Sequence, residues 1–256
     1  MDLGLTGRTV VVTGASSGVG LATTRMLLAE GANVAACARD ADRLKAALDG
    51  LPVHIGACDV LDEAAVQAFV AQAADVFGGI DGVVNNAGRS LMARVSETAD
   101  RQWRDELELK IFSVLHVIRA AQPWLRASDA ASVVNINAIL ARQPEPRLAA
   151  TSAARAALLN LTKTLAGELA ADGIRVNSVC LGLIDTGQWR RRYEQSGSTS
   201  DFAAWSAELA ADRGIPLGRL GTADEVAFPI ASLLSPHASY ITGSAIDVGG
   251  GIARYL

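Results

Sequence analysis

The sequence predicts an α/β fold in which a doubly wound sheet of about seven parallel strands is flanked by helices. Apolar runs rich in β-branched residues alternate with longer segments of helical spacing, as buried parallel strands and their crossover helices do. No linker or change of composition divides the 256 residues. We therefore expect a single domain over residues 1–256, with its ligand at the carboxyl ends of the strands.

Each expected element follows from this alternation. The strands are predicted over Thr9–Thr13, Asn33–Ala38, Val53–Ala57, Gly82–Asn85, Ser132–Ile136, Arg175–Cys180 and Ala245–Val248. The helices are predicted over Gly18–Glu30, Ala41–Leu48, Glu63–Phe77, Ala99–Arg126, Ala150–Ala171 and Ala223–Leu234. Asp185–Arg213 breaks the rhythm after a strand end, where a long insertion is typical of a lid over a ligand.

Composition and charge exclude several classes of partner. Half of the residues are hydrophobic, 20% are charged and the net charge is −4, so no basic field attracts nucleic acid. No apolar stretch approaches the roughly 20 residues that span a bilayer, and the first residues lack a signal-peptide pattern. The three cysteines are widely spaced and the three histidines lack metal-ligand spacing. We expect a cytoplasmic protein with reduced thiols, no metal, no nucleic-acid partner and no membrane segment.

A glycine-rich turn lies between the first strand and the first helix, with the sequence TGASSGVG at residues 13–20. Glycine lets the backbone approach a pyrophosphate, and a helix N-terminus offers free N–H groups and a positive partial charge to that anion. The spacing is G-x-x-x-G-x-G rather than G-x-G-x-x-G, and its place between strand and helix makes it a specific signal. The residues expected to contact the phosphates are Gly14, Ser16, Ser17, Gly18, Val19 and Gly20.

Arg39 ends the second predicted strand, at the position that discriminates between the two nicotinamide dinucleotides. A carboxylate there accepts from the ribose 2′-hydroxyl, whereas an arginine pairs with a 2′-phosphate. We therefore expect NADP(H) to be favoured over NAD(H). Asp40 is adjacent and leaves open the alternative of a solvated surface pair.

Five ordered motifs resemble the short-chain dehydrogenase/reductase family over essentially the whole chain. They are TGASSGVG (13–20), Asp59-Val60, NNAG (85–88), IRVNSV (174–179) with the following turn, and ITG with DVGG near the C-terminus. The resemblance implies a Rossmann-type domain that binds a nicotinamide dinucleotide. It further implies cofactor contacts at Asp59, Val60, Asn86, Ala87, Gly88, Arg155, Gly182, Ile184 and Thr186.

The positions that carry out proton transfer in this family are all substituted here. TSAARAAL (151–158) aligns with the family's Y-S-A-S-K-A-A-L, so Thr151 stands at the tyrosine position and Arg155 at the lysine position. Ala138, thirteen residues before Thr151, stands at the serine position, and Lys110 stands at the asparagine position. The resemblance therefore predicts an oxidoreductase with an atypical active site.

These substitutions change what the site is able to do. A threonine hydroxyl titrates far above the phenol value of about 10, Ala138 has no hydrogen-bonding side chain, and Arg155 keeps its proton at ordinary pH. Lys110 has two interpretations: an acid whose pKa is lowered by Arg155 and burial, or a structural ion pair with Glu106 or Glu108. Asn137 is a further candidate for hydrogen bonding to substrate. The positional candidates for catalysis are Lys110, Asn137, Thr151 and Arg155.

Three functions remain open. The first is NADP(H)-dependent hydride transfer, with the proton supplied by Lys110 or by water. Alternatively, the substrate needs no strong acid, as for a conjugated alkene, an iminium or an aldehyde–hydrate couple. The second is a lyase or isomerase, and the third is a regulatory nucleotide-binding protein without turnover. The basic and aromatic segment QWRRRY (188–193) predicts either capture of an anionic small-molecule substrate or a solvated helix face. The resemblance implies a homotetramer or homodimer formed through the helices Ala99–Arg126 and Ala150–Ala171.

Overall fold

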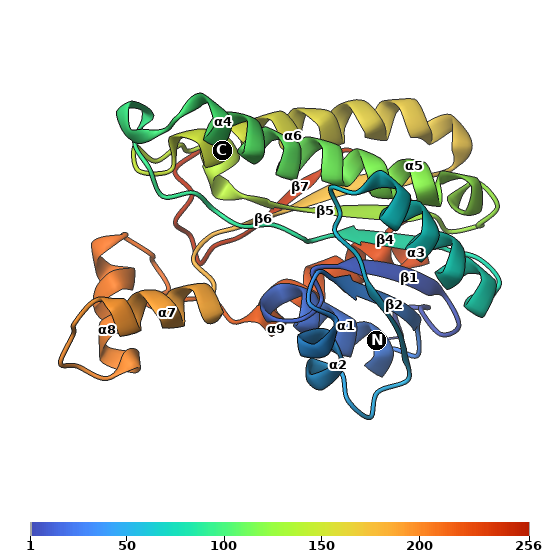
Figure 1. Cartoon of the computed structure of the whole chain (residues 1–256), viewed down its shortest axis with the longest axis horizontal. Coiled ribbons are helices and arrows are strands. Elements are labelled where there is room, and N and C mark those ends of the chain that lie inside the picture. Colours follow the sequence, from blue (N-terminus) through green and yellow to red (C-terminus); the bar gives the residue numbers. More distant parts are fainter. Residues whose placement is uncertain (1, 256) are drawn as a thin grey trace.

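The computed structural model describes residues 2–255 and contains a seven-stranded, all-parallel sheet in the order β3-β2-β1-β4-β5-β6-β7 (Figure 1). This confirms the predicted fold class. The strands are β1 (Thr9–Thr13), β2 (Asn33–Ala38), β3 (Val53–Ala57), β4 (Gly82–Asn85), β5 (Ser132–Ala138), β6 (Arg175–Leu181) and β7 (Ala245–Val248). β5 and β6 run one or two residues past the predicted ends, because Asn137 pairs with Cys180 and Ala138 with Leu181.

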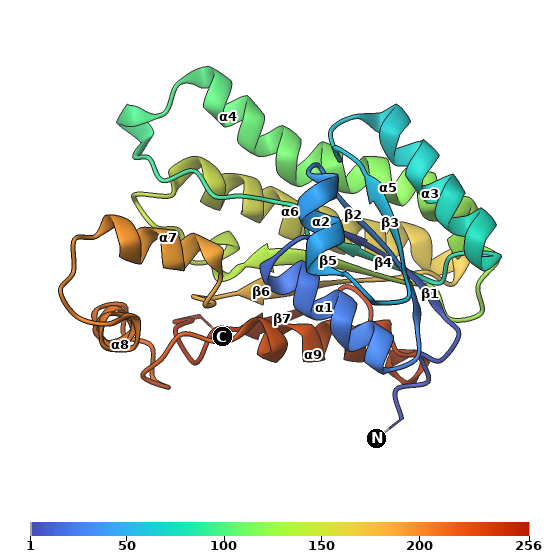
Figure 2. The ribbon, with the colours of Figure 1, turned by 60° about the horizontal axis from the view of Figure 1, so that its bottom comes forward.

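Helices cover both faces of the sheet (Figures 1 and 2). One face carries α1 (Gly18–Ala29), α2 (Ala41–Ala47) and α9 (Ala223–Leu234). The other carries α3 (Glu63–Phe77), α4 (Asp100–Leu107), α5 (Ser113–Leu125) and α6 (Ala149–Glu168). Short helical turns join these elements at η1 (Val95–Glu97), η3 (Ile139–Ala141), η4 (Leu169–Asp172) and η5 (Pro236–Ala238). The central strands are therefore buried on both sides, which explains their continuous apolar sequence.

Side-chain caps and glycines fix where several helices begin and end. The Asp62 carboxylate accepts from the backbone N–H of Ala65 at the start of α3, and Gly78 ends that helix at φ 81°. Thr222 and Glu225 form a reciprocal capping box at the start of α9. The side-chain caps satisfy backbone N–H groups that a helix start leaves free, and Gly78 adopts the left-handed conformation that ends α3, so these boundaries could be predicted closely from the sequence.

The helix predicted over Ala99–Arg126 is not continuous. A π-helical turn, η2 (Glu108–Phe112), separates α4 from α5. A π-turn holds more residues than an α-turn, so residues beyond it lie on a different face from the one that a straight α-helix would give them. Lys110 lies inside this turn and is buried. Local sequence patterns do not reveal such a turn, because it depends on what the turn packs against.

The segment predicted as a lid forms two helices, α7 (Gly187–Gln195) and α8 (Phe202–Asp212), which project from the body beside the end of β6 (Figure 1). No residue of α7 is buried. An aromatic cluster instead joins the two helices, with the rings of Tyr193 and Phe202 5.5 Å apart and those of Tyr193 and Trp205 5.6 Å apart. The lid therefore has a small apolar core of its own.

A buried chain of hydrogen bonds ties the sheet to α6. The Asn85 amide on β4 donates to Asn135 Oδ1 on β5 (2.8 Å), and Asn135 Nδ2 donates to Thr162 Oγ1 on α6 (3.0 Å). Thr162 also bonds to the Ser178 hydroxyl on β6 (3.1 Å). Hydrogen bonds between buried side chains in a low-dielectric core favour a specific geometry, although Asn85 Oδ1 has no partner among the described residues. This network sets the register of α6, the helix that carries Thr151 and Arg155.

Candidate active site

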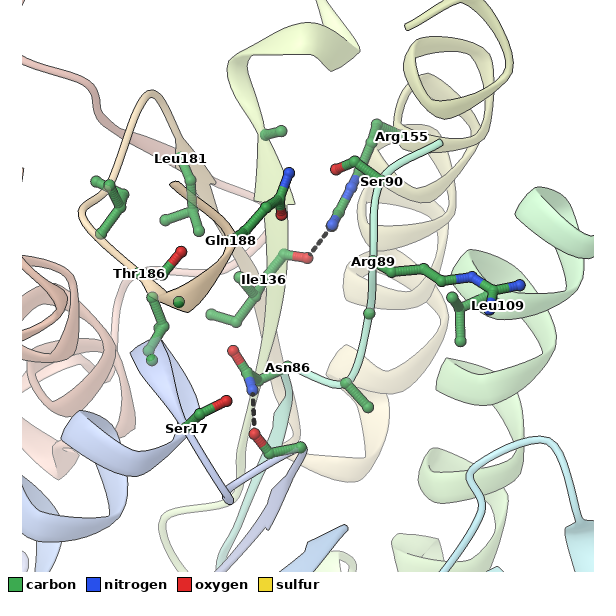
Figure 3. Close-up of a pocket in the computed structure, with 18 of the residues that line it drawn as sticks. Ser17, Asn86, Arg89, Ser90, Leu109, Ile136, Arg155, Leu181, Thr186 and Gln188 are labelled. Atoms are coloured by element: carbon green, nitrogen blue, oxygen red, sulfur yellow. Dashed lines mark hydrogen bonds between the residues drawn. The ribbon is translucent and has the colours of Figure 1, made fainter. Parts of the chain in front are cut away.

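The glycine-rich turn forms a backbone cradle at the end of β1. Gly14 and Gly18 have φ values of 68° and 55°, a region that favours glycine. The Asn86 amide donates to the carbonyls of Thr13 (2.9 Å) and Gly14 (3.1 Å), which holds the cradle against β4 (Figure 3). At the start of α1, Ser17 makes no side-chain cap hydrogen bond. The first N–H groups of α1 are therefore left to an external acceptor.

Arg39 lies at the far end of this cradle. Its side chain is exposed, and it has no hydrogen bond or ion pair with any residue in 2–255. The neighbouring Asp40 is occupied, since its carboxylate accepts from the backbone N–H of Arg43 (2.9 Å) and caps α2. The Asp59 carboxylate is likewise turned to its own loop, accepting from the N–H of Leu61 (3.0 Å). Arg39 thus offers an uncommitted guanidinium at this end of the pocket.

One cavity of about 1030 Å³ brings the predicted cofactor residues together. Its volume is at the upper end of the range for ligand pockets. It lies beside the ends of β1 and β4, where the strand order reverses, which is where parallel sheets bind ligands. The predicted residues that line it are Gly14, Ser16, Ser17, Gly18, Val19, Arg39, Asp59, Val60, Asn86, Ala87, Gly88, Arg155, Gly182, Ile184 and Thr186.

Gly20 does not line the cavity. It packs against the Asn86 side chain and the Gly14 carbonyl, which form part of the cradle. A Cβ at this position would lie 2.4 Å from both Asn86 Nδ2 and the Gly14 carbonyl oxygen. The helix therefore approaches the cradle closely only because residue 20 is glycine.

Arg155 extends from α6 into the middle of the cavity (Figure 3). Its Nη1 donates to the carbonyl of Ile136 on β5, and its buried Nε has no acceptor among the described residues. Burial lowers the pKa of Arg155 and outweighs the opposing effect of Glu106. The guanidinium is still charged, since an arginine pKa remains above the physiological range. It presents a fixed positive charge with an unused donor.

Thr151, Lys110 and Glu106 form a buried cluster behind the cavity wall. Lys110 Nζ donates to Glu106 Oε2 (2.8 Å) and to the Arg89 carbonyl (2.8 Å). The Thr151 hydroxyl donates to the same Glu106 oxygen (2.6 Å) and accepts from the Leu91 N–H (3.0 Å). None of the three side chains lines the cavity, and those of Lys110 and Glu106 are only 2% and 3% exposed. The ion-pair interpretation of Lys110 therefore describes this geometry.

Burial is the largest influence on Lys110, followed by repulsion from Arg155. Together they lower the pKa of Lys110 to about 8, although Glu106 acts in the opposite direction. Glu106 is the acceptor that Lys110 and Thr151 share. The sequence alone indicated Glu106 only as one of two possible ion-pair partners of Lys110 and did not predict its contact with Thr151. The usable signal was its spacing of four residues from Lys110.

The strand end beside Arg155 offers little for substrate binding. Asn137 lines the cavity, but its side chain is fully buried and donates to the Arg155 carbonyl (3.1 Å). Its Oδ1 accepts from the Ala138 N–H (2.9 Å). Ser90 and Gln188, which the sequence did not single out, line the same cavity (Figure 3). Ser90 directly follows the NNAG turn and Arg89, and its place after β4 was the available signal.

The lid end of the cavity is rich in arginine. Arg147, Arg191, Arg192 and Arg213 line it together with Glu145. Arg213 Nη1 donates to Glu145 Oε2 (2.7 Å), an ion pair that connects α8 to the loop before α6. The predicted loop and lid residues therefore meet in one place.

The described residues contain neither a metal-binding cluster nor a membrane-spanning helix. Within residues 2–255, no group of three or more histidine, cysteine, aspartate or glutamate side chains is arranged to hold a metal ion. No helix in the same range is both long enough and apolar enough to cross a bilayer.

Solved structures of related sequence share this fold. A short-chain oxidoreductase from Pseudomonas aeruginosa PAO1, described as containing an atypical catalytic center, is 45% identical. Its apo form covers 98% of this chain and 99% of its own, with a TM-score of 0.94, and it is also known in an NADPH-bound form (TM-score 0.92). L-sorbose reductase from Gluconobacter frateurii, solved with NADPH and L-sorbose, is 33% identical over all of both chains, with a TM-score of 0.94.

The sequence comparisons agree. The putative ketoacyl reductase of the monensin polyketide synthase from Streptomyces virginiae is 35% identical and covers 98% of both chains. The family model described as enoyl-(acyl carrier protein) reductase matches residues 14–253. With the seven-stranded parallel sheet, the glycine cradle and the cavity at the strand ends, these matches show that the chain belongs to the short-chain dehydrogenase/reductase family of oxidoreductases.

Proposed function

We propose that this chain is an NADP(H)-dependent oxidoreductase whose proton does not come from the family's usual residues. Ala138, Thr151, Arg155 and Lys110 stand at the serine, tyrosine, lysine and asparagine positions. The observation that supports the proposal best is the cavity, which joins the glycine cradle, the uncommitted Arg39 and the Arg155 guanidinium in one space. Relatives bound to NADPH are consistent with it.

The residues present fit a phosphorylated dinucleotide. The N-terminus of α1, with no side-chain cap from Ser17, suits a pyrophosphate. The Arg39 guanidinium suits a 2′-phosphate, because no carboxylate in reach competes for it once Asp40 caps α2. The Arg155 guanidinium, which lines the cavity, suits ribose hydroxyls. Bound NADPH would supply a hydride to an electrophilic carbon of the substrate, with water supplying the accompanying proton.

Water is the proposed proton source because the protein's candidate donors are committed elsewhere. The Thr151 hydroxyl donates to Glu106, and Lys110 donates to Glu106 and the Arg89 carbonyl, all behind the cavity wall. Arg155 holds its charge near the reacting centre and stabilises negative charge that develops on the substrate. Such a site suits substrates that need no strong acid, such as a conjugated alkene or an iminium.

A second candidate function is a nucleotide-binding protein without turnover. It is favoured by the same observation, that Thr151 and Lys110 do not line the cavity.

Turnover assays separate the two functions. NADPH oxidation is followed with panels of carbonyls, enones and imines, for the wild-type chain and for Glu106→Gln/Lys110→Met. Turnover that survives the double substitution supports water as the donor, and turnover that is lost assigns the proton to Lys110. Tight NADPH binding with no turnover on any panel supports the second candidate. A lyase or isomerase would convert substrate with no change in NADPH.

Cofactor choice is tested by calorimetric titration with NADPH and with NADH. We expect NADPH to bind more tightly, and Arg39→Asp to weaken NADPH at least about tenfold while sparing NADH, because a carboxylate repels the 2′-phosphate and accepts from the 2′-hydroxyl. Arg25→Asp, on the outer surface of α1, is the charge-matched control. An unchanged NADPH-to-NADH ratio in Arg39→Asp would remove Arg39 from this role.

A further inference from the structure

Three arginines from three separate segments converge at the lid end of the cavity. Arg147 lies in the loop before α6, Arg192 in α7, and Arg213 at the C-cap of α8, and all three line the cavity. They are far apart in the sequence, so only the folded lid brings them together. These three positive charges line the same cavity as Arg155 and repel one another, so a physical explanation of their arrangement is needed.

Among the described residues, Glu145 supplies the acidic partner at this end of the cavity, and Arg213 Nη1 donates to its Oε2 at 2.7 Å. Arg147 and Arg192 have no hydrogen bond or ion pair with any residue from 2 to 255. The Nε of Arg213 is buried and has no acceptor, since the Asp212 carboxylate at 3.8 Å is beyond hydrogen-bond distance. Even without Arg191, which also lines this end, three guanidinium charges therefore face one carboxylate.

The surroundings of Arg192 show the cost of this arrangement. Burial is the main influence that lowers the pKa of Arg192, and the charges of Arg213 and Arg147 lower it further against the opposing effect of Glu145. The guanidinium is nevertheless held in place, with its carbon 4.3 Å from the centre of the Trp189 ring. An anion between these side chains would relieve the repulsion and accept from donors that now have no partner.

Arg190, on the same helix, shows how a satisfied arginine looks in this lid. It binds both carboxylate oxygens of Asp185, at 2.9 and 2.6 Å, and stacks on Phe202. It does not line the cavity. Two residues further along α7, Arg192 also stacks on an aromatic ring, but it lines the cavity and has no carboxylate partner among the described residues. The basic character of the lid is thus not simply that of a solvated helix face.

We propose that Arg147, Arg192 and Arg213 form an anion subsite that holds a carboxylate or phosphate group of the substrate, while its reacting carbon lies near Arg155. The subsite carries two positive charges in excess of Glu145. The guanidinium fork binds both carboxylate and phosphate in a bidentate manner. As a statement about the substrate, the assignment rests on the proposed function. As a statement about an anion site, it stands independently.

Direct binding of simple anions tests the subsite. Succinate and inorganic phosphate are each titrated into the protein with NADPH present, and succinate also into the nucleotide-free protein, with tryptophan fluorescence as the readout because Arg192 stacks on Trp189. We expect saturable binding of at least one probe. The tighter probe identifies the group, and no binding of either overturns the proposal.

The variants Arg192→Met and Arg147→Met are each expected to weaken the probe by about tenfold or more, because each removes a charge-assisted hydrogen bond. Arg190→Met controls for changes to the lid, and Arg101→Met, on exposed α4, controls for net charge. Both controls should bind as the wild-type chain does. Unchanged binding in Arg147→Met and Arg192→Met would overturn the subsite, and so would equal weakening in the two controls. Arg147 lies outside the lid helices, so its variant remains informative if Arg192→Met disturbs α7.

Glu145→Gln supplies a test of opposite sign. It frees Arg213 and removes the competing carboxylate, so we expect the probe to bind several-fold more tightly. Weaker binding would show that Glu145 and Arg213 form a strut for the lid rather than part of an anion site. Failure of NADPH to bind would reject the proposed function and leave the arginine dependence of succinate binding intact. Binding of NADPH without any arginine-dependent binding of succinate would reject only the subsite.

Discussion

At the scale of single residues, Gly20 shows how tightly the nucleotide cradle is packed. A methyl group there would displace the hydrogen bond from Asn86 Nδ2 to the Gly14 carbonyl, since both atoms lie 2.4 Å from the added Cβ. We expect Gly20→Ala to destabilise the protein by about 1–3 kcal/mol, as overpacking does, and to weaken nucleotide binding. Chemical denaturation measures the first effect and calorimetry the second.

Gly167 provides the matched control for this substitution. It is an exposed glycine inside α6, and an added Cβ would meet nothing within 4 Å. Gly167→Ala should raise the stability by about 0.5–1 kcal/mol, because alanine loses less backbone entropy in a helix. If the two substitutions had the same effect, close packing at Gly20 would not be the reason for its glycine.

The buried Lys110 makes stability depend on pH in a specific direction. Its folded pKa of about 8 lies below the value of about 10.4 of an unperturbed lysine, so between these values the unfolded chain binds the proton more strongly. The Lys110 contribution should therefore make the protein more stable as pH rises from about 8 to about 10. The measurement is the free energy of unfolding across this range, for the wild-type chain and for Glu106→Gln/Lys110→Met.

The double variant keeps an acceptor for Thr151 and lacks the titrating lysine, so its difference from the wild type isolates the effect. A wild-type profile parallel to that of the double variant would contradict the prediction. Lys110→Met alone should cost about 3–5 kcal/mol, because it leaves the Glu106 carboxylate buried without its cation. The double variant should recover most of that loss.

At the scale of elements, the lid should be the least stable part of the fold. No residue of α7 is buried and only Ala210 of α8 is, so few contacts resist local opening. We expect α7 and α8 to exchange amide hydrogens faster than α6 in the free protein, and to gain protection when NADPH is added. Hydrogen exchange with mass spectrometry measures both. Protection in α7 equal to that of α6 without ligand would show a rigid lid.

The elements also show what the sequence could predict. The strands, the glycine cradle and most helices follow from local periodicity and turn chemistry, which depend on neighbouring residues. The π-turn at Lys110 and the role of Glu106 depend on packing between α4 and α6, which brings Thr151 to Glu106 across 45 residues. The lid helices pack partly through their own aromatic cluster and partly on the body, where Trp189, Leu209 and Ala210 join an apolar cluster with Ile139 and Cys180. Contacts between residues distant in the sequence therefore could not be predicted from local sequence patterns.

At the scale of the whole molecule, α4, the π-turn η2 and α5 leave apolar side chains uncovered. Leu107, Phe112 and Trp124 are 40%, 49% and 37% exposed, on the helices expected from the resemblance to mediate assembly. Because these exposed apolar side chains lie in the segment that the resemblance implies for assembly, we predict that the protein is a homodimer or homotetramer that uses this face. Light scattering coupled to size exclusion measures the molecular mass directly.

A single substitution should identify the face that associates. Phe112→Lys removes burial worth about 1.5–3 kcal/mol and places a charge in the interface, so we expect a shift to a smaller species at micromolar concentration. Val76→Lys is the control, since Val76 is 57% exposed on α3, which is not one of the helices expected to mediate assembly. A monomeric wild-type chain would reject the assembly itself. An oligomer that tolerates Phe112→Lys would instead direct attention to the face carrying Phe228 and Ile246, which are also exposed.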